Sequence, residues 1–261
     1  MIKRSLLSLL SLFFCLAANA QEPPPSESLG TRFIDMPTPF TIGSRRIEVL
    51  FTHRFQQTVQ DGDSHNLWGL DGGSDVGIGV GVGLTPRFDL AVFRSSFQEN
   101  FELSAKYLIA EQSPRVPLSI GLRAGANLLR REGVEDANRP FVQLPLARRF
   151  APGFNLVVTP SWVRDTPRLR NAFNVPVGIT FPVKKSIVEI EWIPANQDLD
   201  GESEDAWHVA LSREIGDHIF EIVVGNSRAT TVDQYLGGDF AGGFESGDVR
   251  LGFNLIRDFG F

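Results

Sequence analysis

The sequence predicts an all-β protein, a closed antiparallel up-and-down transmembrane β-barrel of about twelve strands. Three observations predict this fold. Apolar and polar residues alternate with period two along most of the chain, the connections between these stretches are alternately long and short, and the chain begins with an export signal. No stretch has the apolar spacing of an amphipathic helix.

The first twenty residues have the pattern of a signal peptide. Lys3 and Arg4 are followed by an apolar run and then by the small-residue end Ala18-Asn19-Ala20. We predict cleavage after Ala20, which also removes the only cysteine, Cys15. The formal net charge then changes from −6 to −8, because two positive charges leave with the signal.

The composition excludes several classes of protein. An acidic chain without a basic block is poorly suited to nucleic acid, so we predict no nucleic-acid partner. A mature chain without cysteine has no structural disulfide and no cysteine-based metal site. The mean hydropathy of −0.05 is typical of a soluble protein, and no later apolar run approaches the roughly 20 residues that a membrane helix needs. Periodicity, not composition, therefore points to the membrane.

The clearest alternation lies in residues 76–84, where aliphatic residues alternate with Gly77, Gly79, Gly81 and Gly83. A helix there would contain four glycines, each costing about 1 kcal/mol, and would have no apolar stripe. A strand instead gains one aliphatic face. The twelve predicted strands are 47–55, 76–84, 88–94, 101–109, 118–124, 141–147, 154–162, 173–181, 188–192, 207–211, 220–224 and 249–261.

Loop lengths and aromatic residues favour a membrane barrel over a soluble one. Long loops such as 56–73 and 227–247 alternate with short turns such as 85–87 and 183–186, which predicts both termini on the periplasmic side. Aromatic residues recur at strand ends, as in membrane girdles. The last residue, Phe261, resembles the terminal signal read by the barrel-insertion machinery, which we predict as a partner together with outer-membrane lipid. A soluble lipocalin-like barrel or periplasmic sandwich also alternates and is the alternative.

Several segments resemble an uncharacterised family of bacterial outer-membrane β-barrel proteins, a domain of unknown function. The similarity runs from about residue 33 to residue 261. The resemblance implies a barrel and an outer-membrane location, and it implies no reaction. The segments that carry it include Thr52-His53-Arg54-Phe55, Trp68-Gly69-Leu70-Asp71-Gly72-Gly73, Phe93-Arg94-Ser95-Ser96, Gln234-Tyr235-Leu236-Gly237-Gly238 and Gly252-Phe253-Asn254-Leu255-Ile256-Arg257-Asp258-Phe259.

We divide the chain into a signal peptide (1–20), a periplasmic N-terminal tail (21–43) and an outer-membrane barrel domain (44–261). The tail contains Pro23-Pro24-Pro25 and is too polar and proline-rich at its start to join a strand. Near its end, Phe33, Ile34 and Met36 are apolar enough to dock under the mouth of the barrel.

Charged residues occupy the strand face opposite the aliphatic one, and such charge is tolerated only in a polar lumen. This arrangement fits either a hydrated, salt-bridged interior or a narrow path whose acids set ion selectivity. The predicted lumen-lining residues are Glu48, Arg54, Glu102, Lys106, Arg123, Glu189, Glu191, His208, Glu221 and Arg250.

We predict no metal site, cofactor or catalytic residue. Glu189, Glu191, His208 and Glu221 come from three consecutive strands and could hold a divalent cation, but no ligand spacing requires one. For a serine hydrolase, His208 and Ser212 lie about 13 Å apart along one strand, too far for proton transfer. The sequence therefore indicates that the protein is not an enzyme.

The glycine-lined face of residues 76–84 leaves room for another segment to approach the wall closely. The candidates are the loop 227–247 and the N-terminal segment. We favour the loop, because it is the longest and holds Tyr235, Phe240 and Phe244, which would otherwise face water.

On these grounds we predict a narrow channel or binding barrel for a small solute or ion. The alternative is a non-conducting structural or interaction barrel that displays acidic extracellular loops. A lipid-modifying enzyme ranks third.

Overall fold

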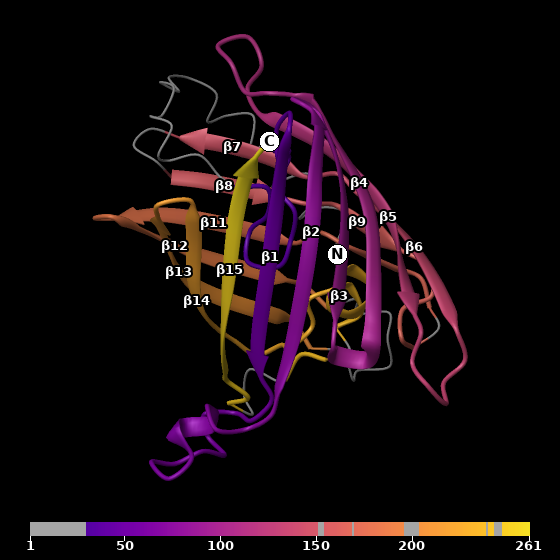
Figure 1. Cartoon of the computed structure of the whole chain (residues 1–261), viewed down its shortest axis with the longest axis vertical. Coiled ribbons are helices and arrows are strands. Elements are labelled where there is room, and N and C mark those ends of the chain that lie inside the picture. Colours follow the sequence, from indigo (N-terminus) through magenta and orange to yellow (C-terminus); the bar gives the residue numbers. More distant parts are fainter. Residues whose placement is uncertain (1–29, 151–153, 169, 196–203, 239, 243–246) are drawn as a thin grey trace, which may run out of the picture.

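The computed structural model describes residues 30–150, 154–168, 170–195, 204–238, 240–242 and 247–261. These residues form a barrel whose wall is one continuous antiparallel sheet (Figure 1). The predicted signal peptide with its cleavage site, and the start of the predicted tail, lie outside the described residues.

The barrel is closed and has twelve strands, which confirms the predicted fold class. Strand β1 (Arg46–Phe55) pairs with both β2 (Ser74–Thr85) and the last strand, β15 (Arg250–Gly260), so the two ends of the sheet meet. The other strands that run without a break are β3 (Phe88–Ser95), β4 (Asn100–Ala110), β5 (Ser119–Leu129), β12 (Ser186–Ile193), β13 (Ala206–Ile215) and β14 (His218–Gly225).

Three neighbouring strands are each divided in two at a proline. Pro145, Pro160 and Pro176 lie in the gaps, and a proline cannot donate a hydrogen bond to the ladder. Their carbonyl oxygens still accept bonds across the wall, for example from Leu144 N to Pro160 O at 2.8 Å. The strand pairs are β6 (Ala137–Gln143) with β7 (Leu146–Phe150), β8 (Phe154–Val158) with β9 (Ser161–Val163), and β10 (Ala172–Asn174) with β11 (Val177–Val183).

Helical structure is confined to short pieces in the loops. These are the 3-10 turns η2 (Leu67–Gly69) and η3 (Phe97–Glu99), and the helix α2 (Val232–Gly237). Within the described ranges, no helix is long and apolar enough to cross a membrane.

The two faces of the wall have opposite character. Ile78 and Ile222 on the outer face are 54% and 53% exposed, whereas Glu191, His208 and Asn254 on the inner face have no exposed surface. An apolar outer face and a polar inner face are the pattern of a barrel embedded in lipid. A soluble barrel would have the reverse arrangement.

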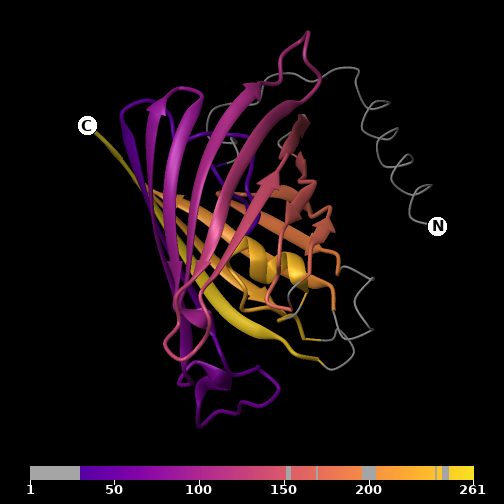
Figure 2. The same ribbon diagram turned by 90° about the vertical axis from the view of Figure 1, so that its right-hand side faces the viewer.

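The lumen is filled from both ends by non-strand segments. The first, which we call the N-terminal plug, is residues 31–42; its neighbours Gly30 and Gly43 lie at the end of the barrel that carries the short turns Val183–Ser186 and Ile215–His218. The second, the loop plug, is the described part of residues 226–242, which enters from the opposite end and includes α2. Figure 2 shows α2 inside the barrel.

The N-terminal plug corrects one prediction. We expected residues 21–43 to form a tail below the barrel, but Phe33, Ile34 and Met36 have no exposed surface. They pack in the lumen against inward-facing wall residues, including Val157 and Ala210. Burial of these apolar side chains stabilises the inserted position.

The glycine face of β2 corrects a second prediction. A Cβ at Gly81 would collide with Ile42, and one at Gly83 would collide with the backbone of Gly43. The segment that approaches this face is therefore the N-terminal plug, not the loop that we favoured. The loop does enter the lumen, but it packs against β6, β9 and β10 on another part of the wall.

Candidate functional site

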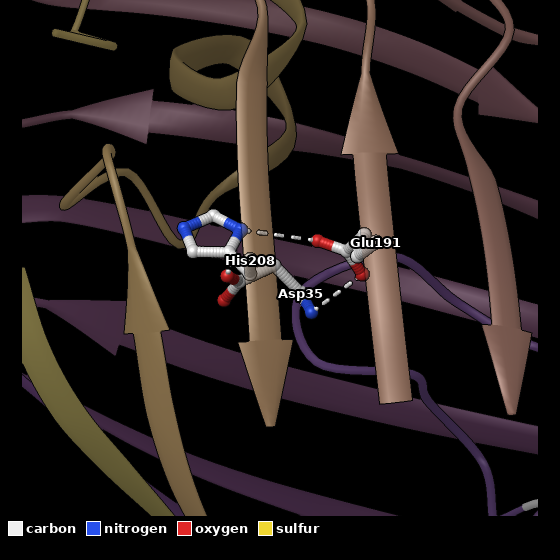
Figure 3. Close-up of side chains that lie close together, drawn as sticks. All are labelled: Asp35, Glu191 and His208. Atoms are coloured by element: carbon white, nitrogen blue, oxygen red, sulfur yellow. Dashed lines mark hydrogen bonds and ion pairs between the residues drawn. The ribbon is translucent and has the colours of Figure 1, made fainter. Parts of the chain in front are cut away.

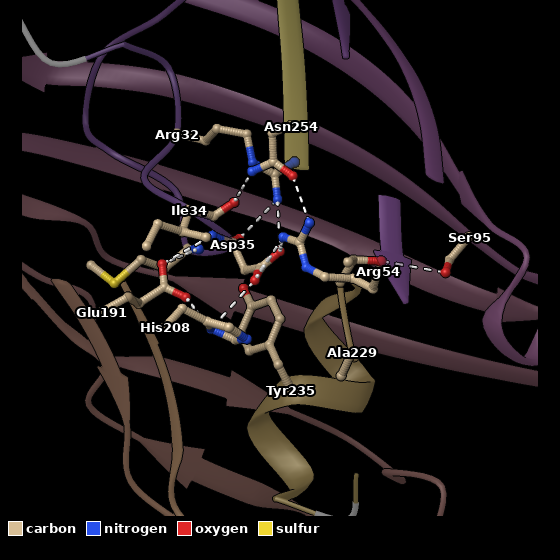
Figure 4. Close-up of polar contacts among 12 residues, drawn as sticks. Arg32, Ile34, Asp35, Arg54, Ser95, Glu191, His208, Ala229, Tyr235 and Asn254 are labelled. Carbon is tan, nitrogen blue, oxygen red and sulfur yellow. Dashed lines mark hydrogen bonds and ion pairs between the residues drawn. The ribbon is translucent and has the colours of Figure 1, made fainter. Parts of the chain in front are cut away.

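Two buried clusters of charged residues hold the plugs in the lumen. The first, which we call the Asp35 centre, consists of Asp35, Arg54, Glu191 and His208 (Figure 4). Arg54 donates from Nη2 to Asp35 Oδ1 at 3.0 Å and Oδ2 at 3.3 Å, and from Nη1 to Asn254 Oδ1 at 2.8 Å. Burial alone would raise the pKa of Asp35, but the charges of Arg54, His208 and Arg32 outweigh it and hold the pKa below its usual value.

The other two members of the Asp35 centre come from adjacent strands. Glu191 on β12 lies directly opposite His208 on β13 in the sheet. Glu191 Oε2 accepts hydrogen bonds from the backbone N–H groups of Asp35 and Met36, both at 2.9 Å. His208 Nδ1 lies 3.5 Å from Asp35 Oδ2 and 3.5 Å from Glu191 Oε1 (Figure 3). The wall thus binds the N-terminal plug both through the side chain of Asp35 and through the backbone of Asp35 and Met36.

The second cluster, the Asp233 centre, consists of Glu102, Arg123, Arg139 and Asp233 and holds the loop plug. Arg139 Nη1 donates to Asp233 Oδ2 at 2.7 Å, and Glu102 accepts from the backbone N–H of Val232 at 2.8 Å. Arg123 forms an ion pair with Glu102 at 2.5 Å. Burial raises the pKa of Asp233, although hydrogen bonds from Arg139 and Thr231 oppose the effect.

A large cavity opens at the short-turn end of the barrel. It has a volume of about 530 Å³, and we call it the vestibule. Glu189 and Glu221 line its inner part and are 8% and 2% exposed, whereas Lys184 and Lys185 lie in the turn at its rim. Glu221 accepts from Asn254 Nδ2 at 2.7 Å. Within the described part of the chain, neither glutamate has a basic group within 4.0 Å.

The remaining predicted lumen residues lie apart from these clusters. Glu48 accepts a hydrogen bond from Thr31 Oγ1 at 2.7 Å, and Lys106 donates to the Thr31 carbonyl at 2.7 Å, so both hold the start of the N-terminal plug. Arg250 lies at the long-loop end, where it contacts the carbonyl oxygens of Gln56 and Asn226.

The structure does not bring the four residues considered for a cation into one site. Glu191 and His208 are together, but Glu189 and Glu221 face the vestibule instead. The third acid beside His208 is Asp35, which we did not predict because alternation says nothing about a segment outside the strands. A signal was present, since Asp35 stands alone within the apolar stretch Phe33 to Met36, where an unpaired carboxylate would be costly to bury.

These features define a class: an outer-membrane-type β-barrel with an apolar outer face and a lumen that holds two inserted segments. The chain belongs to the family described as "Membrane bound beta barrel domain (DUF5777)", whose model matches residues 29–259. This match confirms the predicted resemblance to a barrel family of unknown function.

Solved structures that match this chain share about a tenth of its sequence. Outer membrane phospholipase A from Escherichia coli has a TM-score of 0.47 and 10% identity, covering 81% of this chain and 89% of that one. CdiB from Acinetobacter baumannii has a TM-score of 0.36 and 11% identity, covering 83% of this chain and 60% of that one. No match was found among curated proteins. At this similarity, neither structure indicates the activity of this chain.

Proposed function

We propose that the protein is a binding barrel for a small cationic solute, which enters the vestibule at the short-turn end. Both plugs occupy the lumen in this conformation, and on this proposal a narrow channel would form only if the plugs moved. The observation that carries the proposal is the vestibule itself, in which two buried carboxylates line about 530 Å³ of space and form no ion pair within 4.0 Å among the described residues.

Electrostatics favours a cation there. A carboxylate removed from bulk water needs a counter-charge or hydrogen-bond donors to offset its lost hydration. The wall supplies Asn254 to Glu221, and the neutral Asn155, Thr180 and Ser212 also line the cavity. The bases that line it, Arg32, Lys184 and Lys185, form no ion pair with either glutamate within 4.0 Å among the described residues. A small organic cation would supply both the charge and the donors.

Titration calorimetry of the refolded mature chain with putrescine, a small diamine, tests this proposal. Putrescine should bind, whereas the neutral butane-1,4-diol should not. Glu189→Gln combined with Glu221→Gln should weaken putrescine binding on the order of tenfold or more. Glu214→Gln, at the exposed rim, is the matched control and should change it little. Equal binding by the wild-type chain and the double variant would contradict the vestibule site.

A non-conducting structural barrel is the second candidate, and the two plugs favour it over an open channel. It predicts that no small cation binds in the vestibule, so the same titration separates the two candidates. The proposal assigns no reaction to the chain. The contacts of His208 support this, because its ring nitrogens face Asp35, Glu191 and Ser227 rather than Ser212.

The location proposed for the chain is the outer membrane, reached by export and cleavage after Ala20. We propose that the short-turn end faces the periplasm and that Phe261 is read by the insertion machinery. Phe261 is 64% exposed at the end of the last strand, so its side chain is accessible.

A further inference from the structure

Three potential metal ligands converge in the Asp35 centre. One oxygen each from Asp35 and Glu191 and one ring nitrogen of His208 all lie within 4.8 Å of one another. All three side chains have no exposed surface. Figure 3 shows the imidazole and the two carboxylates turned toward one another from the plug and two strands of the wall.

The hydrogen bond at the far side of the imidazole determines what His208 presents to the carboxylates. His208 Nε2 lies 3.3 Å from the carbonyl oxygen of Ser227, which can only accept a hydrogen bond, so Nε2 carries the proton. In the neutral ring, Nδ1 then presents a lone pair to two carboxylate oxygens, each 3.5 Å away. Neither His208 Nδ1 nor Glu191 Oε1 has a hydrogen-bond partner.

Each of the same three groups is also oriented by a hydrogen bond to a residue that is not one of the three ligands or to the backbone. Two backbone N–H groups fix Glu191 through its other oxygen, Arg54 fixes Asp35, and the Ser227 carbonyl orients the imidazole. Metal sites in proteins use such outer contacts to orient their ligands. Arg54 and Arg32 both approach Asp35, and Figure 4 shows Arg32 on the side away from His208.

In the Asp233 centre, by contrast, every carboxylate oxygen has a hydrogen-bond donor. There, Glu102 is bonded by Arg123, by Asn127 and by the backbone of Val232. Asp233 is bonded through both oxygens, to Arg139 on one side and to Asn100 and Thr231 on the other. Of the two centres, only the Asp35 centre has a carboxylate oxygen without a donor, Glu191 Oε1.

We propose that Asp35, Glu191 and His208 bind a divalent transition-metal ion of the Zn²⁺ class. Zn²⁺ binds nitrogen and oxygen ligands at about 2.0–2.2 Å in tetrahedral geometry, which places the ligand atoms roughly 3.3–3.6 Å apart. The two separations of 3.5 Å from His208 Nδ1 match that spacing. An imidazole in the ligand set favours Zn²⁺ over Ca²⁺ or Mg²⁺.

The ion would cross-link the N-terminal plug to the barrel wall. Asp35 belongs to the N-terminal plug, whereas Glu191 and His208 belong to β12 and β13. Bound metal would therefore hold the plug in the lumen. This inference goes beyond the proposed cation binding, because the vestibule carboxylates Glu189 and Glu221 are not ligands.

The test uses the mature chain without a histidine tag, refolded in detergent and stripped with EDTA. Titration calorimetry with ZnCl₂ should give one tight site per chain, confirmed by metal analysis after desalting. Glu191→Gln and His208→Ala should each weaken Zn²⁺ binding at least on the order of 10- to 100-fold. Glu189→Gln is the matched control, since it lies on the same face of the same strand, and it should leave Zn²⁺ binding unchanged while reducing putrescine binding.

Two readouts keep the proposal testable if a variant does not fold. Co²⁺ added to the wild-type chain should give the visible absorption of a tetrahedral site. Zn²⁺ should also slow proteolysis within residues 31–42. The proposal would be overturned if no stoichiometric site were found, or if both folded ligand variants bound Zn²⁺ as tightly as the wild-type chain. The space between the three groups would then be filled by a proton on His208 Nδ1 instead of a metal ion.

Discussion

The two plugs are held by the same two kinds of contact, but only one of the two charged centres has a hydrogen-bond partner for every carboxylate oxygen. In each, a plug aspartate pairs with a wall arginine, Asp35 with Arg54 and Asp233 with Arg139. In each, a wall glutamate also accepts backbone N–H groups of the plug. Glu102 has its own arginine, whereas Glu191 faces His208 with an unpartnered oxygen. The comparison suggests that the loop plug is a fixed part of the barrel, and that the N-terminal plug depends on an additional cation.

The largest expected effect follows from removing both plugs. Replacing residues 231–244 with a Gly-Ser linker removes the loop plug but leaves Phe33, Ile34 and Met36 in the lumen. Phe33→Asp should displace the N-terminal plug but leaves the loop plug in place. Each single change should therefore give little conductance in a planar bilayer. The combination should raise single-channel conductance on the order of tenfold over either. Full conductance after one change would show that the other segment does not close the lumen.

The second prediction compares the two arginines that bind the plug aspartates. Arg54→Met removes both hydrogen bonds to the Asp35 carboxylate and leaves only the longer ion pairs with Arg32 at 3.8 Å and His208 at 3.5 Å. The free energy of unfolding in urea should fall by about 3–5 kcal/mol. Arg139→Met leaves Asn100 and Thr231 bonded to Asp233, so a loss of about 1.5–3 kcal/mol is expected.

Both measurements are made in EDTA, so that metal does not contribute to stability. The control is Arg46→Met, which breaks an ion pair whose side chains are 48% and 35% exposed and should cost about 0–1 kcal/mol. If Arg139→Met were the more damaging change, the loop plug rather than the N-terminal plug would depend on its buried ion pair.

The third prediction concerns the space that the N-terminal plug occupies. A Cβ at Gly178 would lie 2.8 Å from the ring of Phe33. Gly178→Ala should therefore destabilise the inserted plug by about 1–3 kcal/mol and speed proteolysis within residues 31–42. Gly260→Ala adds a Cβ with nothing within 4 Å and serves as the control. Unchanged cleavage in the Gly178 variant would mean that Phe33 does not pack against this wall.

The strands could be predicted from sequence because alternation separates the apolar and polar faces of each strand, and the loop lengths and terminal aromatic residues favoured an apolar face that meets lipid. The same pattern identified the inward-facing charges, since a charge on the lipid face would be costly. The breaks at Pro145, Pro160 and Pro176 were missed, because the apolar alternation continues through them. Their effect depends on hydrogen bonds to the neighbouring strand, which a single segment does not reveal.

The plugs were harder to predict, for a physical reason. Periodicity places a residue on a face of a strand, but Asp35 and Asp233 lie outside the strands. Which wall residues they meet depends on how the closed barrel brings β12, β13 and β1 around the segment. The sequence indicated that something must cover Gly81, but both candidate segments contained suitable apolar residues, so composition could not choose between them.

The smallest expected effect is the loss of one hydroxyl group in the loop plug, and it tests whether packing contributes more than single polar contacts to holding that plug. Tyr235 is 2% exposed, and its hydroxyl accepts a hydrogen bond from Gln143 Nε2 at 2.9 Å. Tyr235→Phe keeps the ring among Phe141, Val163 and Leu236 and removes only the hydroxyl. The free energy of unfolding in urea should fall by about 0.5–1.5 kcal/mol. Tyr235→Ala also empties the space of the ring and should cost about 3–5 kcal/mol. If both variants lost the same free energy of unfolding, the hydrogen bond would account for the whole contribution of Tyr235. The loop plug would then depend on a few polar contacts, as the N-terminal plug does.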